Sequence, residues 1–100
     1  MDADSMNGRE IVDYLIRRRA EKYGLDLVIQ WYKCFQSREQ IANIKCGDRD
    51  LKLCFSVEEI DDLPGHTRLD DNEPVARPRN DEFFEVIRSR VYSAIDGFAR

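Results

Sequence analysis

One histidine and three cysteines are the residue types in this sequence best suited to metal binding or nucleophilic chemistry. His66 is the only histidine, and a catalytic or metal-binding histidine needs partners. Cys34, Cys46 and Cys54 are separated by 11 and 7 intervening residues, whereas structural zinc sites usually contain a pair only about two to four residues apart. We therefore interpret the cysteines as small apolar strand residues and His66 as an exposed loop residue, and we predict no metal and no cofactor.

Catalytic motifs give no stronger signal. Asp50-Leu51-Lys52 resembles a fragment of the acid-x-Lys element of metal-dependent nucleases, but residues 41–46 before it contain no carboxylate to help hold Mg²⁺. The sequence has no glycine-rich phosphate loop, Walker motif or HExxH element. We predict that the chain is not an enzyme.

Charge is the strongest compositional signal in the chain. There are 20 acidic and 16 basic side chains, for a net charge of −4. Residues 58–73 hold seven acids, opposed by Arg68 alone. This acidic tract consists of Glu58, Glu59, Asp61, Asp62, Asp70, Asp71 and Glu73. Local negative charge speeds encounter with positive surfaces and helps to select them, so we predict that the tract contacts a basic partner. A merely solvated surface is the plainer interpretation.

These observations favour a non-enzymatic protein-binding module. An inhibitor, immunity or adaptor protein that engages a basic partner fits this description. If that partner normally binds nucleic acid, the acidic tract would act as a phosphate mimic. The alternative is a nucleic-acid-binding domain that uses a basic cluster at the end of the first helix, Arg17, Arg18, Arg19 and Lys22. The acidic balance disfavours it, because nucleic-acid binders usually carry a basic stripe. The sequence leaves a homodimer open.

The expected cellular location depends on two features of the sequence, its apolar runs and its number of cysteines. No apolar run approaches the length that spans a bilayer, and the start, Met1-Asp2-Ala3-Asp4, is acidic, unlike a secretory signal. An odd number of cysteines argues against a disulfide framework. We expect a cytoplasmic protein without membrane association.

Periodicity predicts the elements that position these residues. Residues 8–23 have helical spacing, with Asn7 and Glu10 matching a capping box and Gly24 as a natural end. Residues 25–34 alternate between apolar and polar positions, which is typical of a half-buried strand and places Trp31 on the core face. Two more strands are expected at about 40–46 and 50–56.

The parity of the second and third strands constrains their pairing. Ala42, Ile44 and Cys46 are even positions, whereas Leu51 and Leu53 are odd. Pairing Ile44 with either leucine puts both apolar sets on one face, with a turn of two or four residues. A slip of one residue would turn the apolar set outward.

The second half of the chain is predicted to be less regular. Ser56 and Glu59 favour a short helix at 57–62. Residues 58–79 are expected to form a long acidic loop that contains all three prolines, and Asn80 is expected to cap a final helix. The fold class is then α+β, in the order α-β-β-β-α. We expect residues 1–100 to form one domain, with the helices on one face of a three-stranded antiparallel sheet.

This order of elements resembles that of double-stranded-RNA-binding domains. Those domains carry lysines at the start of the last helix, where this chain has Asp81 and Glu82. Two carboxylates at that place would repel phosphate. The resemblance is therefore one of element order, and it argues against RNA binding.

Overall fold

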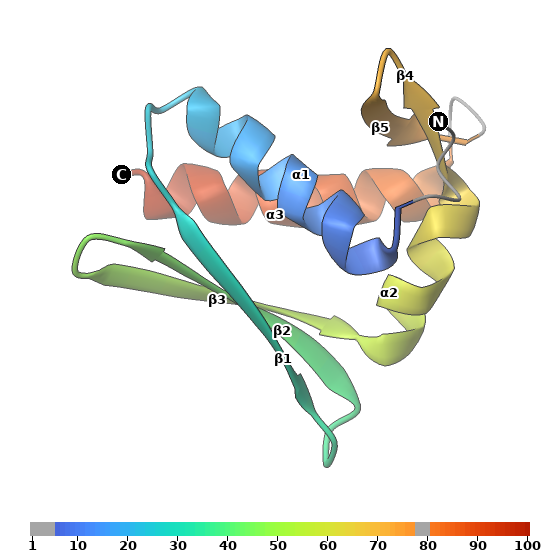
Figure 1. Ribbon diagram of the computed structural model, residues 1–100, viewed down its shortest axis with the longest axis horizontal. Coiled ribbons are helices and arrows are strands. Elements are labelled where there is room, and N and C mark those ends of the chain that lie inside the picture. Colours follow the sequence, from blue (N-terminus) through green and yellow to red (C-terminus); the bar gives the residue numbers. More distant parts are fainter. Residues whose placement is uncertain (1–5, 78–80) are drawn as a thin grey trace.

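The computed structural model describes residues 6–77 and 81–100, and it confirms the α+β class (Figure 1). The helices are α1 (Gly8–Glu21), α2 (Val57–Asp62), a 3-10 helix (Leu63–His66) and α3 (Glu82–Phe98). The strands are β1 (Val28–Cys34), β2 (Glu39–Cys46), β3 (Arg49–Ser56), β4 (Thr67–Asp70) and β5 (Glu73–Ala76).

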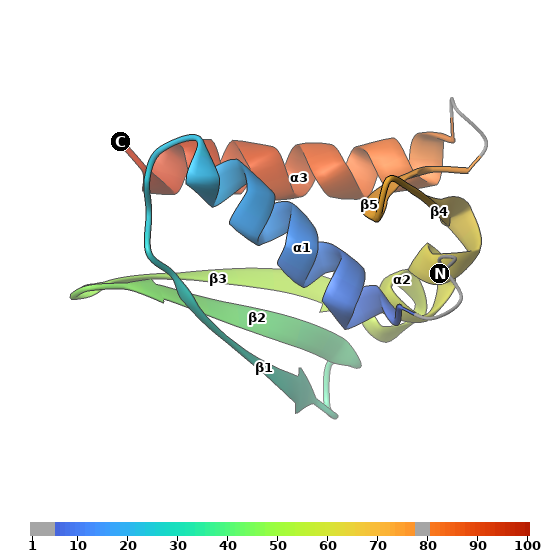
Figure 2. The ribbon, with the colours of Figure 1, turned by 45° about the horizontal axis from the view of Figure 1, so that its top comes forward.

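The predicted three-stranded antiparallel sheet is confirmed, with β2 between β1 and β3. Figure 2 shows α1 and α3 on one face of this sheet, and no described element covers the other face. The uncovered face carries Val28 and Tyr32, whose exposed fractions are 59% and 41%. The core lies between the sheet and the helices.

Helix α1 begins as the sequence predicts. The Asn7 side chain accepts a hydrogen bond from the Glu10 backbone N–H at 2.9 Å, and the Glu10 carboxylate accepts one from the Asn7 N–H at 3.2 Å. This capping box satisfies two backbone donors that the helix cannot pair internally. Gly8, the first helical residue, is buried against Ile60 of α2.

Helix α3 has the predicted apolar stripe but a different cap. The Asp81 carboxylate accepts from the Phe84 N–H at 3.0 Å, so Asp81 is the N-cap. The predicted cap, Asn80, lies outside the described residues. The stripe is buried and consists of Phe84, Ile87, Val91, Ile95 and Phe98.

The hairpin of β2 and β3 confirms the predicted parity. Ile44 pairs with Leu51 and Ala42 with Leu53, across a two-residue turn at 47–48. Gly47 has a φ of 64°, a conformation that glycine adopts without a steric penalty. Both Ile44 and Ala42 are fully buried, so the register places the apolar side chains under the helices.

Trp31 lies on the predicted face of β1 but is only half-buried. Its ring lies 6.3 Å from that of the buried Phe55, and its other side borders a groove on the surface. The prediction that Trp31 is on the core face is confirmed, but the side chain is only partly covered. An edge strand has a neighbour on one side only, which leaves part of a large side chain uncovered.

The short helix predicted at 57–62 is confirmed as α2, but the long loop predicted over the rest of 58–79 is wrong as far as residue 76. Residues 57–76 form α2, the 3-10 helix and the antiparallel hairpin of β4 and β5, whose two-residue turn consists of Asp71 and Asn72. Their φ angles of 52° and 67° are those of a type I′ turn, which Asp and Asn tolerate. Thr67 is fully buried, and its hydroxyl donates to the Leu63 carbonyl oxygen at 2.7 Å.

Candidate functional site

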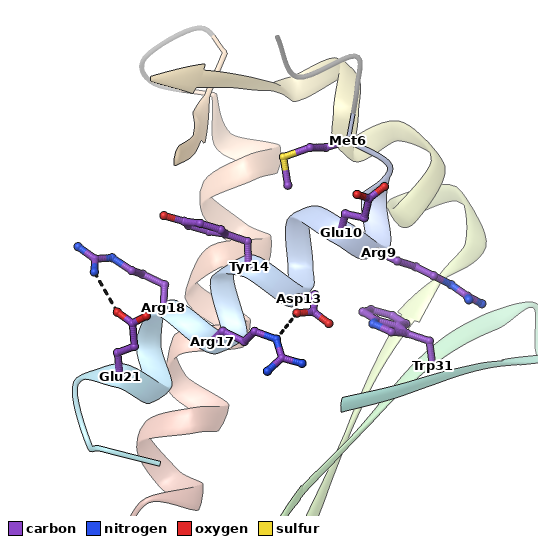
Figure 3. A pocket seen from close by; sticks show the side chains of 9 residues that line it. All are labelled: Met6, Arg9, Glu10, Asp13, Tyr14, Arg17, Arg18, Glu21 and Trp31. Carbon is purple, nitrogen blue, oxygen red and sulfur yellow. Dashed lines mark hydrogen bonds and ion pairs between the residues drawn. The ribbon is translucent and has the colours of Figure 1, made fainter. Parts of the chain in front are cut away.

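A groove of about 580 Å³ runs over the exposed face of α1, beside β1 (Figure 3). Helical spacing puts residues 10, 14, 17 and 21 on one face of α1, and Trp31 borders the groove from β1. The lining consists of Met6, Arg9, Glu10, Asp13, Tyr14, Arg17, Arg18, Glu21 and Trp31. Apolar and aromatic surface therefore meets a charged helix face.

The charges of the groove balance and are largely paired with one another. Arg17 contacts Asp13 at 2.6 Å, and Arg18 contacts Glu21 at 3.2 Å (Figure 3). The Arg9 guanidinium lies 5.6 Å from the Trp31 ring centre and also hydrogen-bonds the Gln40 side chain. Three arginines and three carboxylates leave no net charge to attract a strongly charged ligand.

The indole N–H of Trp31 is in an unusual environment. It is buried and has no hydrogen-bond partner among the described residues. A buried donor without a partner costs about 1–3 kcal/mol. The groove therefore borders a side chain whose hydrogen bonding is incomplete in the isolated chain.

The edge of β1 beside this groove is open. No described strand pairs with it, and Lys33 is the only charged residue among its seven. An edge of this kind presents unpaired backbone donors and acceptors to another strand. Uncovered edge strands in natural proteins are usually protected by charges, proline, bulges or covering segments.

The opposite edge, at β3, is protected. Strand β3 carries Arg49, Asp50 and Lys52. The Arg90 guanidinium of α3 donates to the Cys54 carbonyl oxygen at 2.6 Å, which occupies one of the acceptors of this strand. The two edges of the sheet therefore differ in their capacity to pair.

The structure divides the predicted acidic tract. Three of its seven members form ion pairs: Glu58 with Arg38 at 3.1 Å, Glu59 with Arg90 at 2.8 Å and Glu73 with Arg18 at 3.9 Å. Glu59 also completes the predicted capping box of α2, since its carboxylate accepts from the Ser56 N–H at 2.9 Å. These three acids have structural roles.

The other four acids are exposed and make no ion pair within residues 6–77 and 81–100. Asp61 and Asp62 lie in α2, whereas Asp70 and Asp71 lie at the tip of the hairpin of β4 and β5. Figure 1 shows this tip pointing away from α2. The seven residues therefore do not form a single patch.

The basic cluster of α1 is mostly neutralised. Besides the two pairs in the groove, the Arg19 guanidinium makes two hydrogen bonds of 2.8 Å to Asp96 of α3, and Tyr23 donates to the same carboxylate at 2.6 Å. These contacts join α1 to α3. All three arginines that were candidates for phosphate binding thus have carboxylate partners.

His66 is not the exposed loop residue that the sequence predicts, because it is half-buried and ends the 3-10 helix. Its Nδ1 lies 2.7 Å from the Asp81 carboxylate, and its ring stacks on Phe83 at 4.4 Å. The hydrogen bond from His66 lowers the pKa of Asp81. No hydroxyl or thiol within the described residues hydrogen-bonds His66, so the pair joins the 3-10 helix to α3 without forming a nucleophilic site.

The cysteines are all free thiols, and Cys34 and Cys46 are half-buried while Cys54 is exposed. Within the described ranges, no group of three or more His, Cys, Asp or Glu side chains is placed to hold a metal ion. No helix of the described residues is long and apolar enough to cross a membrane.

The Arg19–Asp96 contact predicts a dependence of stability on pH. Hydrogen bonds from Arg19 and then Tyr23 hold the pKa of Asp96 well below its usual range. A depressed folded-state pKa stabilises the fold above the unfolded-state pKa of about 3.9, and this contribution is lost as the pH falls through the folded-state pKa. Asp96→Asn should therefore lower the melting temperature at pH 7 and flatten its decline in acid.

Thermal melts between neutral and strongly acidic pH measure this effect. Asp26→Asn is the matched control, since Asp26 is exposed and makes no ion pair in the described part of the chain. An Asp96→Asn profile parallel to that of the unmodified protein would refute the contribution.

Comparisons with known proteins give no guide to this site. No protein-family model matches the sequence, and no match was found to a curated protein or to a solved structure.

Proposed function

We propose that the protein is a non-enzymatic binding module that recognises an extended segment of a partner protein at the open edge of β1. The observation that carries this proposal is the seven-residue edge with a single charge, next to the α1 groove. In strand addition, main-chain hydrogen bonds supply affinity, and pockets for alternate side chains supply specificity.

The groove supplies the second requirement. A strand added beside β1 directs alternate side chains towards the face that bears the helices, where Trp31 and Arg9 lie side by side (Figure 3). Tryptophan and arginine are the residue types enriched among the energetically dominant contacts of interfaces. An apolar or aromatic side chain of the partner would pack on Trp31, with the paired charges of α1 as a polar rim.

Trp31 is the only tryptophan in the chain, so its fluorescence reports on this site directly. The probes are peptides selected from a random displayed library. We expect binding to shift the Trp31 emission, and we expect amide shifts in ¹H–¹⁵N spectra to concentrate on β1 and α1. Shifts that map to β3 and α3, without a change in Trp31 emission, would overturn the proposal.

A pair of truncations tests the groove itself. Tyr14→Ala removes a lining side chain outside the buried core and should weaken peptide binding about tenfold, as for an energetically important interface residue. Val86→Ala removes a more exposed side chain on α3, 55% accessible and outside the groove, and should leave binding unchanged. Equal loss in both variants would argue against the groove.

A second candidate is the docking of a basic protein partner on the acidic tract. The four acids without a base in the described part of the chain support it, because folding gives them no intramolecular partner there. An inhibitor or adaptor that engages a nucleic-acid-binding protein would use such carboxylates as phosphate mimics.

Two sets of amide substitutions separate the acids by role. Asn at Asp61, Asp62, Asp70 and Asp71 should leave the free energy of unfolding nearly unchanged, whereas Gln at Glu58, Glu59 and Glu73 should lower it by about 1–2 kcal/mol in total, since each surface pair contributes roughly 0.2–1 kcal/mol. Denaturant titrations measure both values. Equal stabilities would show that the ion pairs do not stabilise the fold.

The same two sets test docking with a deca-arginine peptide as the probe. If the acids without a base form the docking surface, the aspartate set should lose most binding at low salt, and the glutamate set should retain it. Unchanged binding by the aspartate set would identify those residues as solvated surface.

A further inference from the structure

We propose that the strand that pairs with β1 is β1 of a second copy of this chain, so that the protein forms a two-fold symmetric dimer with a continuous six-stranded sheet. This inference rests on the proposed use of the β1 edge for strand pairing. It adds the identity of one partner, argued from the self-complementarity of the edge and of the helix face beside it.

The sequence of β1 is compatible with pairing to itself. In an antiparallel pair centred on Trp31, Gln30 lies opposite Tyr32 of the second copy, and Trp31 lies opposite its own counterpart. Lys33, the only charge, lies opposite Ile29. No like charges face each other, and the central aromatic pair is of the kind that stabilises neighbouring strands.

The last pair in this register joins Val28, an exposed apolar residue, to Cys34 of the second copy. Val28, 59% exposed in the single chain, lies opposite the half-buried Cys34. Val28 and Tyr32 are on the uncovered face of the sheet, and the added strand covers part of each. Pairing therefore removes apolar surface from water as well as joining backbone groups.

The exposed face of α1 is self-complementary in the same arrangement. A two-fold axis perpendicular to the joined sheet keeps both α1 helices on one face and makes them antiparallel. The first half of the α1 face carries Glu10 and Asp13 against one base, Arg9, and the second half carries Arg17 and Arg18 against one acid, Glu21, so the halves have net charges of −1 and +1. The acidic half of each helix thus faces the basic half of the other, as a symmetric interface requires.

The mass of the full chain in solution tests the proposal. Sedimentation equilibrium from micromolar to millimolar protein should show a shift from 11.8 kDa towards twice that mass, 23.6 kDa. A mass of 11.8 kDa over the whole range would overturn the dimer.

Lysines in the edge test the interface. Gln30→Lys combined with Tyr32→Lys places two ammonium groups opposite each other across the strand pair, twice per dimer, and should give the monomer mass. Both side chains are exposed in the single chain, so circular dichroism melts should change little. Cys54→Lys, at an exposed position of β3, is the matched control and should remain dimeric. A dimer that survives the edge lysines would overturn this interface.

Two variants of opposite charge test whether the α1 faces of the two copies contact each other. Asp13→Lys makes both halves of the face basic, whereas Arg17→Glu with Arg18→Glu makes both halves acidic, so each variant alone should dimerise at least tenfold more weakly than the parent. Their mixture should recover a heterodimer, because opposite charges again face each other. Failure of the mixture to associate more tightly than either variant would overturn the proposed helix arrangement.

The outcomes distinguish the dimer from the proposed function. A monomer whose Trp31 emission responds to selected peptides overturns the dimer and leaves strand recognition standing. A dimer that is disrupted by the edge lysines but binds no peptide at any concentration supports self-pairing and overturns recognition of other partners.

Discussion

Replacing Gly8 with alanine is expected to lower the free energy of unfolding by about 3 kcal/mol, at the upper end of the usual cost of overpacking. An alanine Cβ at this position would lie 2.7 Å from Ile60 Cγ2 and 2.8 Å from the Ile60 carbonyl carbon, and closer still to the carbonyl oxygen. Two of these three atoms are backbone, so relief requires α1 to move away from α2. Urea titrations of the variant measure the loss.

A second glycine provides a control of opposite sign. Gly97 lies in the last turn of α3, and a Cβ there would meet no atom within 4 Å. Alanine is a better helix former than glycine by about 1 kcal/mol, so Gly97→Ala should raise stability slightly. If Gly8→Ala were also neutral or stabilising, the contact between α1 and α2 would be looser than the structure has it.

Truncating Phe84 to alanine is expected to cost about 3–5 kcal/mol, the usual range for a buried phenylalanine. Phe84 is 1% exposed and begins the apolar stripe of α3. The loss combines the transfer of the aromatic ring to water with the cavity left behind. Because a small domain has only about 5–15 kcal/mol of stability in all, the variant should be partly unfolded at moderate temperature.

The same substitution at Phe35 serves as the control. Phe35, in the turn between β1 and β2, is 86% exposed, so Phe35→Ala should change stability by no more than about 0.5 kcal/mol. Thermal and urea melts of the two variants give the comparison. Similar losses at both positions would show that Phe35 is covered in solution.

Local rules were sufficient for the elements with strong periodicity. The capping boxes at Asn7 and Ser56 and the parity of Ile44 against Leu51 each depend on residues close in sequence or on one alternating pattern. Such signals are fixed by hydrogen-bond geometry and by the two faces of a strand. The structure accordingly reproduces them to within a few residues.

The hairpin of β4 and β5 escaped prediction because its strands are short. Each has four residues, one begins at the buried Thr67, and the other contains Pro74, which weakens any strand pattern. The available signal was the Asp71-Asn72 pair, whose side chains tolerate the positive φ of a type I′ turn. The sequence predicts Asp71 only as a member of the acidic tract, whereas in the structure Asp71 and Asn72 form the turn between β4 and β5.

The groove could not be predicted from the sequence alone. Periodicity identifies which side of residues 8–23 faces the core, but the position of Trp31 beside the exposed side of α1 depends on how the helix crosses the sheet. The pairing of acids with distant arginines, such as Glu59 with Arg90, depends likewise on tertiary packing. Charge counting therefore overstated how many acids were available to a partner.

The Arg90 hydrogen bond to the Cys54 carbonyl oxygen makes the β3 edge less available for pairing with another strand. A sheet with two open edges can add copies at both, and such head-to-tail growth has no natural end; it gives filaments. If the β1 edge pairs with a second copy, as we propose, the free edges that remain on the dimer are its two β3 edges, each with three charged residues. Further growth would then require two β3 edges to pair, which their charged residues and the Arg90 contact disfavour.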